Sequence, residues 1–184
     1  MGDGRQRFWF SALTVVGLAL LVVVFVWINP TKASAPDSAS AESESLVIGE
    51  PAPAFAGVSL DGEQVSLDSL AGRPIWLVFN ATWCTSCRGE IPDIQAVHES
   101  ELGSEIELVS VYLGESKEIV SPFVDRLRLT YRAVPDPDSA ISQAYRVPGV
   151  PVHYFIDAEG ILRGVKIGSL GRTEMESQLG ALLG

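Results

Sequence analysis

The sequence predicts an α/β fold, with a mixed central sheet flanked by helices and one transmembrane helix before it. Three observations carry this prediction. Residues 8–28 contain no charged side chain. Residues 75–80 (IWLVFN) form a continuous apolar run, which is typical of a strand covered on both faces. After that run, strand-like segments alternate with helical ones, which favours a sheet with helices on both faces.

The uncharged run 8–28 is long enough to cross a bilayer as a helix of about 32 Å. Arg5 and Arg7 precede it, so the positive-inside rule places residues 1–7 in the cytoplasm and the rest of the chain outside. The alternative is a signal peptide cleaved near residues 33–35 (ASA), although signal-peptide apolar regions usually run about 7 to 15 residues. Both interpretations deliver the remaining chain to the same extracytoplasmic compartment.

Residues 29–45 are mostly small, polar and acidic, and we interpret them as a flexible linker because they cannot bury enough apolar surface to fold. Residues 46–184 then form a single domain of ordinary size. The chain carries 13 Lys and Arg against 23 Asp and Glu, a net charge of −10. This balance, without any basic cluster, disfavours nucleic acid as a partner.

The first half of the domain begins with a predicted β-hairpin, residues 58–60 and 64–67, around Asp61 and Gly62. The strand 75–80 follows, and then a helix that starts at the cysteine motif and carries Ile91, Ile94, Val97 and His98. Residues 106–113 predict the next strand. Ser116 can cap a helix that runs to about residue 129.

The second half predicts a short strand at 131–134 and a helix at 139–145 capped by Asp138. Residues 152–157 and 161–167 predict an antiparallel hairpin around the turn 157–160. Thr173 and Glu176 match a capping box, so we expect the last helix to begin near residue 173.

Both cysteines of the chain, Cys84 and Cys87, lie at the predicted strand-to-helix junction, in the sequence WCTSC. A helix N-terminus favours negative charge, which lowers the pKa of a thiol there and makes the thiolate that attacks disulfides. The second cysteine, about one turn further on, can then resolve the mixed disulfide. We therefore interpret Cys84 as an exposed nucleophile and Cys87 as the resolving thiol of a redox-active disulfide.

Three other uses compete with this interpretation of the pair. A structural disulfide is possible, although so short a loop gains little entropic stabilisation. A zinc site needs two more ligands, for which the chain offers only His98 and His153. Attachment of c-type haem needs a histidine at position 88, where this chain has arginine.

Gly149-Val150-Pro151-Val152-His153 lies at the entry to a predicted strand. A proline in that position can adopt a cis bond, which leaves the preceding backbone free to pair with an extended substrate. On its own this segment also fits an ordinary loop.

With these motifs, the domain resembles the thioredoxin superfamily, and more narrowly the membrane-anchored ResA/TlpA/DsbE-type thiol–disulfide oxidoreductases. The resemblance covers about residues 48–168, and the segments that carry it are 81–87 (ATWCTSC), 90–92 (EIP), 112–116 (YLGES), 144–147 (AYRV), 149–151 (GVP) and 154–157 (YFID). It implies a thioredoxin fold with an N-terminal β-hairpin and a β-α insertion at about 101–129.

The resemblance also implies a cis Pro151 and site roles for Trp83, Cys84, Cys87 and Glu90. The buried aspartate of thioredoxin is replaced by Val78, so we hypothesise that Glu90 is a partly buried carboxyl with a raised pKa that exchanges protons with the cysteines. The alternative for Glu90 is a solvated helix glutamate. We assign substrate binding to Trp83, Val150, Pro151 and His153.

Two residues depart from the family pattern. Ser86 stands where proline is usual, and its hydroxyl and N–H add donors near sulfur, so we expect a lower thiolate pKa and a less negative reduction potential. His153 stands where threonine is common. It is expected to contact substrate or to modulate Cys84 by its charge, unless it is simply a strand histidine facing solvent or a helix.

These features predict a membrane-tethered, extracytoplasmic thiol–disulfide oxidoreductase that needs no cofactor. By resemblance it reduces client disulfides, for example in apocytochrome c during cytochrome c maturation, with electrons from a membrane thiol carrier. A general disulfide oxidase or isomerase is the first alternative. A copper-binding module using Cys84, Cys87 and His153 is a second. The tryptophan-led motif argues against a thiol peroxidase.

Overall fold

The computed structural model describes residues 46–184, and their central feature is a five-stranded sheet with the strand order β5–β4–β3–β6–β7. The predicted membrane span 8–28 and linker 29–45 lie outside the described residues. Within 46–184, no helix has the length and apolar character that a membrane span requires.

The chain order of the elements matches the predicted alternation. The elements are β1 (Ala56–Val58), β2 (Gln64–Ser66), the 3-10 helix η1 (Asp68–Leu70), β3 (Ile75–Asn80), α2 (Thr85–His98), α3 (Glu101–Ser104), β4 (Glu107–Leu113), α4 (Lys117–Leu127), β5 (Arg132–Asp136), α5 (Ala140–Ala144), β6 (Val152–Ile156), β7 (Leu162–Ile167) and α6 (Arg172–Leu183). Strand β3 pairs parallel with β4 and antiparallel with β6, so the predicted mixed sheet is confirmed. The short helices η1 and α3 were not predicted.

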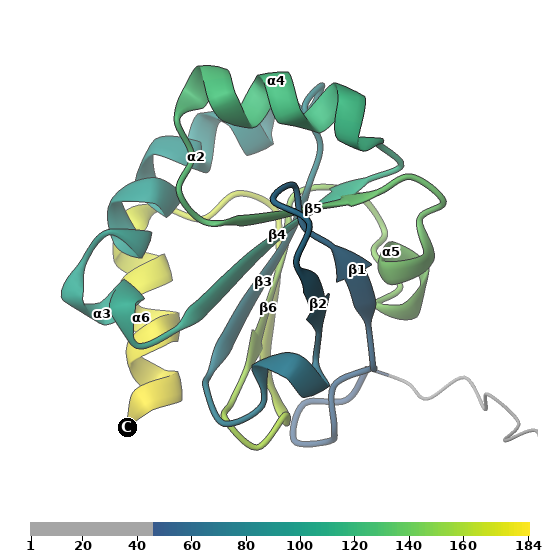
Figure 1. Ribbon diagram of the computed structural model, residues 1–184. Helices are drawn as coiled ribbons and strands as arrows, with labels where there is room; N and C mark the ends of the chain where they lie inside the picture. Colours follow the sequence, from purple (N-terminus) through teal and green to yellow (C-terminus); the bar gives the residue numbers. More distant parts are fainter. Residues whose placement is uncertain (1–45) are drawn as a thin grey trace, which may run out of the picture. The chain divides into compact units, whose positions relative to one another are not determined.

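The sheet is covered on both faces because its strands present apolar side chains to each side in alternation. Leu77 and Phe79 of β3 pack in a core with residues of β2 and α5, and Trp76 and Val78 pack against α2 and α6. In Figure 1, α2, α4 and α6 lie above and to the left of the sheet, and the β1–β2 hairpin and α5 lie to its right. All six residues of β3 are buried, as its apolar run predicted.

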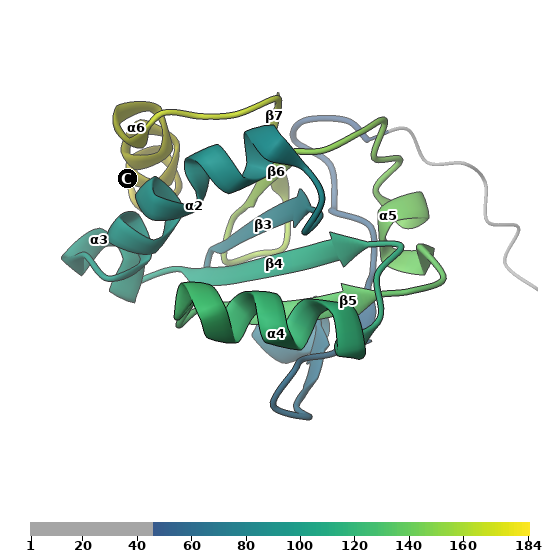
Figure 2. The ribbon, with the colours of Figure 1, turned by 90° about the horizontal axis from the view of Figure 1, so that it is seen from above.

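Strand β3 leads directly to the cysteine motif. Figure 2 shows the end of β3 beside the first turn of α2, with α4 running along β4 and β5. A central strand held on both sides therefore fixes the start of α2, and with it the position of the cysteines.

The three predicted helix caps differ in detail. Ser116 is the N-cap residue of α4, as predicted, but its side chain makes no capping hydrogen bond. Helix α6 starts at Arg172 after Gly171, with no side-chain cap, and Glu176 accepts a hydrogen bond from Arg172 instead of closing a capping box. At α5, the buried Asp136 accepts from the backbone N–H groups of residues 141 and 142, whereas the exposed Asp138 accepts one long bond, 3.3 Å, from the N–H of residue 140. Asp136 is the last residue of β5 and lies further from the helix than Asp138, so its position in the sequence did not identify it as the cap.

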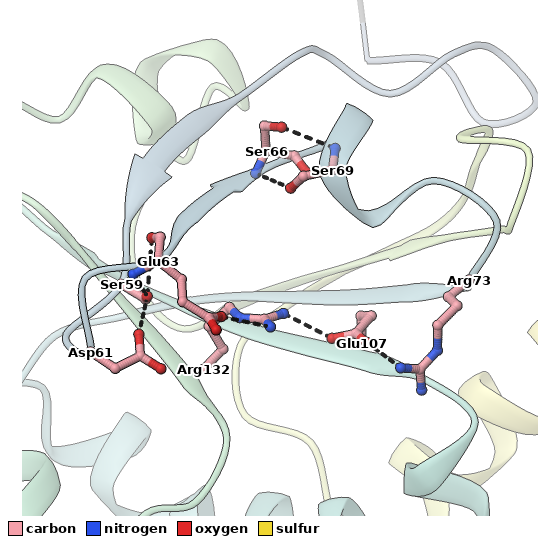
Figure 3. Close-up of polar contacts among 8 residues, drawn as sticks. All are labelled: Ser59, Asp61, Glu63, Ser66, Ser69, Arg73, Glu107 and Arg132. Atoms are coloured by element: carbon pink, nitrogen blue, oxygen red, sulfur yellow. Dashed lines mark hydrogen bonds and ion pairs between the residues drawn. The ribbon is translucent and has the colours of Figure 1, made fainter.

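A chain of ion pairs ties the N-terminal hairpin to the sheet at the end remote from the cysteines (Figure 3). Glu107 at the start of β4 pairs with Arg73 and, at 2.9 Å, with Arg132, which also reaches Glu63 at 3.3 Å. These side chains are partly exposed, so each pair contributes little free energy, at most about 1 kcal/mol. Of the three pairs, the one between Arg132 and Glu63 joins the hairpin to β5.

Candidate active site

The cysteine pair lies at the first turn of α2 as a disulfide, with the two Cα atoms 5.3 Å apart. Cys84 is the N-cap residue in an extended conformation, and its Sγ accepts a hydrogen bond from the N–H of Cys87 at 3.1 Å. The sulfur thus takes the place that a serine or aspartate oxygen takes in an ordinary N-cap. The same N–H and the helix dipole are in position to stabilise a thiolate on Cys84.

Cys84 is more covered than the exposed nucleophile that the sequence predicted. Its exposed fraction is 5%, against 1% for Cys87. The cover comes from Ala81 and from Val150, which pack against the two sulfurs in a small apolar cluster. Cys84 is still the more accessible of the two sulfurs, which favours it as the one that attacks a client disulfide.

Ser86 places its hydroxyl oxygen 3.3 Å from Sγ of Cys84. Because a disulfide sulfur carries no proton, the serine O–H is the donor in this contact. The donor near sulfur that the sequence predicted is therefore present, on the exposed side of the first helical turn.

The opposing wall is the Val150–Pro151 peptide, which is cis as the resemblance implied. The carbonyl oxygen of Val150 lies 3.7 Å from Sγ of Cys84. The Pro151 carbonyl accepts from the N–H of Gly168 at 2.9 Å, which fixes this loop to the end of β7. Trp83, immediately before the nucleophile, is 64% exposed. An exposed aromatic ring and a backbone carbonyl group therefore both lie close to the Cys84 sulfur.

Glu90 lies three residues after Cys87, on the same side of α2, and is only 3% exposed. The solvated alternative for Glu90 is therefore wrong. Its Oε2 accepts a hydrogen bond from the N–H of Leu170 at 3.0 Å. Its Oε1 is buried and has no hydrogen-bond partner among residues 46–184. A buried carboxyl with one free oxygen beside the cysteine pair fits the predicted proton exchange, which stays a prediction.

His153 lies inside the molecule, away from the substrate surface. Its side chain is 0% exposed, so the expected contact between His153 and substrate does not fit this structure. Position 153 is in β6, where all five residues are buried, and its side chain faces inward beside Trp76. The Trp76 indole N–H donates to Nδ1 of His153 at 3.3 Å, and Nε2 lies 3.4 Å from Oε2 of Glu90.

A second buried carboxyl group near the motif belongs to Glu115, which is 4% exposed and had no predicted role. Its two oxygens accept from the backbone N–H and the hydroxyl of Thr82, at 2.8 and 2.6 Å. Glu115 thereby holds the loop between β3 and Cys84. The sequence did contain one indication that these two residues meet. Thr82 and Glu115 both follow the carboxyl ends of neighbouring parallel strands, β3 and β4.

Comparison with known proteins agrees with this geometry. The model of the AhpC/TSA family matches residues 48–165. Over 130 residues the chain is 31% identical to the thiol-disulfide oxidoreductase ResA of Bacillus subtilis, covering 71% of this chain and 73% of that protein. It is 28% identical over 138 residues to ResA of Geobacillus kaustophilus, covering 75% and 79%. The fold also matches a crystal structure of a protein from Chlorobium tepidum assigned as the thiol:disulfide interchange protein DsbE, with a TM-score of 0.70 and 27% identity. The match covers 76% of this chain and 100% of that one.

Proposed function

The chain belongs to the AhpC/TSA family and is a thiol–disulfide oxidoreductase of the ResA/DsbE type, and from this premise we propose that it reduces disulfides in client proteins outside the cytoplasmic membrane. The observation that carries the proposal is the Cys84–Cys87 disulfide at the N-cap of α2, facing the cis Val150–Pro151 peptide. This arrangement combines a stabilised thiolate, a nearby second thiol and a main-chain surface for the client.

The reaction starts from the reduced pair. The Cys84 thiolate attacks a client disulfide, a Cys84–client bond forms, and the first client sulfur leaves as a thiolate. Cys87 then gives its proton to Glu90 and attacks Sγ of Cys84, which releases the second client sulfur. Two electrons pass to the client, and the Cys84–Cys87 disulfide that forms is the one the structure contains. A membrane thiol carrier returns the pair to the dithiol.

Client binding uses the surface around the disulfide. The Trp83 ring supplies exposed apolar area, and the Val150 main chain lies beside the reacting sulfur. An extended client segment laid along residues 150 and 151 brings its own sulfur to Cys84, in the manner of an added strand.

Apocytochrome c before haem attachment is the client that we propose, on the strength of the resemblance to the ResA/TlpA/DsbE-type proteins. In a Cys87→Ser variant the mixed disulfide is not resolved, so the client stays bound to Cys84. Recovery of apocytochrome c in that complex by mass spectrometry is the expected result. A complex that contains only unrelated secreted proteins would contradict this client.

The direction of electron flow is tested by the reduction potential of the cysteine pair, measured against a dithiothreitol or glutathione series. A reductant is expected between the glutaredoxin and thioredoxin ranges, about −200 to −270 mV. A value of about −120 mV, the range of DsbA, would instead assign the protein as an oxidase. An intermediate value near about −180 mV, with rapid rearrangement of a scrambled substrate, would favour the isomerase alternative.

The copper-binding alternative gains no support from the described domain. Within residues 46–184, no group of three or more His, Cys, Asp or Glu side chains is arranged to hold a metal ion. His153, which that alternative needs as a ligand, has its two ring nitrogens directed at Trp76 and Glu90. Stoichiometric, tight binding of Cu(I) by the reduced protein would reopen it.

A further inference from the structure

A buried polar chain of three side chains lies between the sheet and α2, behind the disulfide. Trp76 is on β3, His153 is on β6 and Glu90 is on α2, and their exposed fractions are 1%, 0% and 3%. The indole N–H of Trp76 donates to Nδ1 of His153 at 3.3 Å, and Nε2 of His153 lies 3.4 Å from Oε2 of Glu90.

The Trp76 contact determines which nitrogen of His153 carries the proton. An indole nitrogen can only donate, so Nδ1 has to accept and cannot itself be protonated. A neutral imidazole then carries its proton on Nε2, the atom that faces Glu90. His153 therefore presents an N–H group to the carboxyl without adding a charge.

The Leu170 N–H and the His153 ring both lie near the same oxygen of Glu90. Oε2 accepts from the N–H of Leu170 at 3.0 Å and faces His153, while Oε1 is left without a partner among the described residues. Glu115 shows the contrasting arrangement, because both of its oxygens are occupied by Thr82. Glu115 is thus a structural acceptor, whereas Glu90 keeps one oxygen available on the helix face that it shares with Cys87.

We propose that His153 is a positioning residue for proton exchange at the cysteine pair. Trp76 holds the imidazole with its proton on Nε2, and this N–H binds Oε2 of Glu90. The other oxygen of Glu90, Oε1, is then free to exchange a proton with Cys87. This inference rests on the proposed function. In the oxidised state the His153–Glu90 contact is long, 3.4 Å, and is not yet a hydrogen bond. Such contacts often tighten only in the reacting complex.

His153 does not pass protons onward. A relay through the imidazole requires the second nitrogen to exchange its proton, and Nδ1 is blocked by the Trp76 N–H, which does not titrate. Other titratable groups nearby are Cys87 on α2 and Tyr131 before β5, whose pKa is raised well above its usual value by burial and also by the charges of Tyr112 and Glu90. Lys166 lies opposite His153 on β7 and is paired with Glu174 at 2.9 Å.

The test measures the single-turnover rate at which the reduced full-length protein reduces oxidised glutathione, as a function of pH. A His153→Leu variant removes the donor to Glu90. The rate of this variant at pH 7 is expected to fall about tenfold, which is the effect of losing one hydrogen bond to a charged group. Its pH profile is expected to move to higher pH, because the Glu90 carboxylate has lost a donor. A His153→Gln variant restores an acceptor for Trp76 and a donor for Glu90, and is expected to keep the wild-type profile.

The matched control is His98→Gln, which removes the other histidine of the chain at the far end of α2 and is expected to change neither rate nor profile. A role in folding alone would slow the His153→Leu protein equally at every pH. A folded His153→Leu protein with the wild-type profile would overturn the proposal. If that variant does not fold, Trp76→Phe takes its place, and an unchanged profile there has the same meaning.

A second measurement separates this inference from the proposed function. Nitrogen-15 NMR of the wild-type imidazole is expected to show His153 protonated on Nε2 and unprotonated on Nδ1, and a proton on Nδ1 would overturn the inference. Absence of any glutathione reduction by the wild type would count against the proposed function, and the NMR result would still decide the assignment of His153.

Discussion

Ser86 brings a hydroxyl to 3.3 Å from the Cys84 sulfur, in a helical turn that already directs the Cys87 N–H at the same atom. Both donors stabilise a negatively charged sulfur more than a disulfide sulfur. They therefore favour the reduced form of the pair, and a stabilised reduced form makes the potential less negative. Proline at position 86 provides neither the hydroxyl nor an N–H, which is how a single side chain tunes the chemistry without altering the fold.

A Ser86→Ala substitution tests this effect. The reduction potential is expected to become about 20 to 30 mV more negative, since one hydrogen bond contributes about 1 kcal/mol and about 30 mV corresponds to 1.4 kcal/mol. The reaction of Cys84 with iodoacetamide is expected to move to higher pH. Thr85→Ala is the control, because Thr85 is also exposed but its hydroxyl accepts from Arg88. Equal shifts in both variants would show that the Ser86 hydroxyl is not responsible.

At the scale of elements, α5 is held by a carboxylate from the preceding strand. Asp136 is 2% exposed, and its oxygens accept from the N–H groups of Ile141 and Ser142 and from the Ser142 hydroxyl. Three hydrogen bonds thus attach a helix of five residues to the end of β5. The ring of Tyr145, which ends this helix, packs into the core against Phe79, so the cap also positions part of the core.

Asp136→Asn is expected to lower the free energy of unfolding by about 2 kcal/mol, because it weakens a buried, charge-assisted cap. Asp138→Asn is the matched control two residues away. Asp138 is exposed and accepts a single bond of 3.3 Å, so its loss is expected to change stability by less than about 0.5 kcal/mol. Urea denaturation measures both values. A larger loss in the Asp138 variant would mean that the sequence-predicted cap is the important one after all.

At the scale of the whole molecule, the redox chemistry and its supporting core belong to residues 46–184. The apolar clusters on both faces of the sheet and the Cys84–Cys87 disulfide are built from residues in that range. The proposed extracytoplasmic location, in contrast, depends on residues before that range, either as an uncleaved anchor at 8–28 or as a cleaved signal peptide. Chemistry and location are therefore expected to be separable.

Removal of residues 1–45 tests this separation. The truncated protein is expected to reduce oxidised glutathione at the full-length rate, because no residue of the site is removed. It is also expected to leave the membrane fraction, in which the full-length protein should be found. Alkaline phosphatase fused after residue 184 should be active in the full-length protein only if that end lies outside the cytoplasm. A full-length protein found entirely in the soluble fraction would contradict an uncleaved anchor.

Much of the fold was predictable because the signals for it are local. The continuous apolar run of β3, the alternation of strands and helices, and the turn signals of both hairpins are read over a few residues. The helix starts were less predictable. Asp136 caps α5 across a turn, and α6 begins at Arg172, after Gly171, without a side-chain cap. The packing of the whole domain therefore overrode the capping residue nearest in the sequence.

By itself, the sequence determined the strand order along the chain, the cysteine pair at a strand-to-helix junction, and the disulfide chemistry that follows from that position. Only the tertiary structure decided the surroundings of the pair. Glu90 and His153 are 63 positions apart in the sequence, and their contact exists because β6 packs beneath α2. Which face of a buried strand a polar residue occupies depends on the packing of the whole sheet, and no local pattern around His153 contains that information.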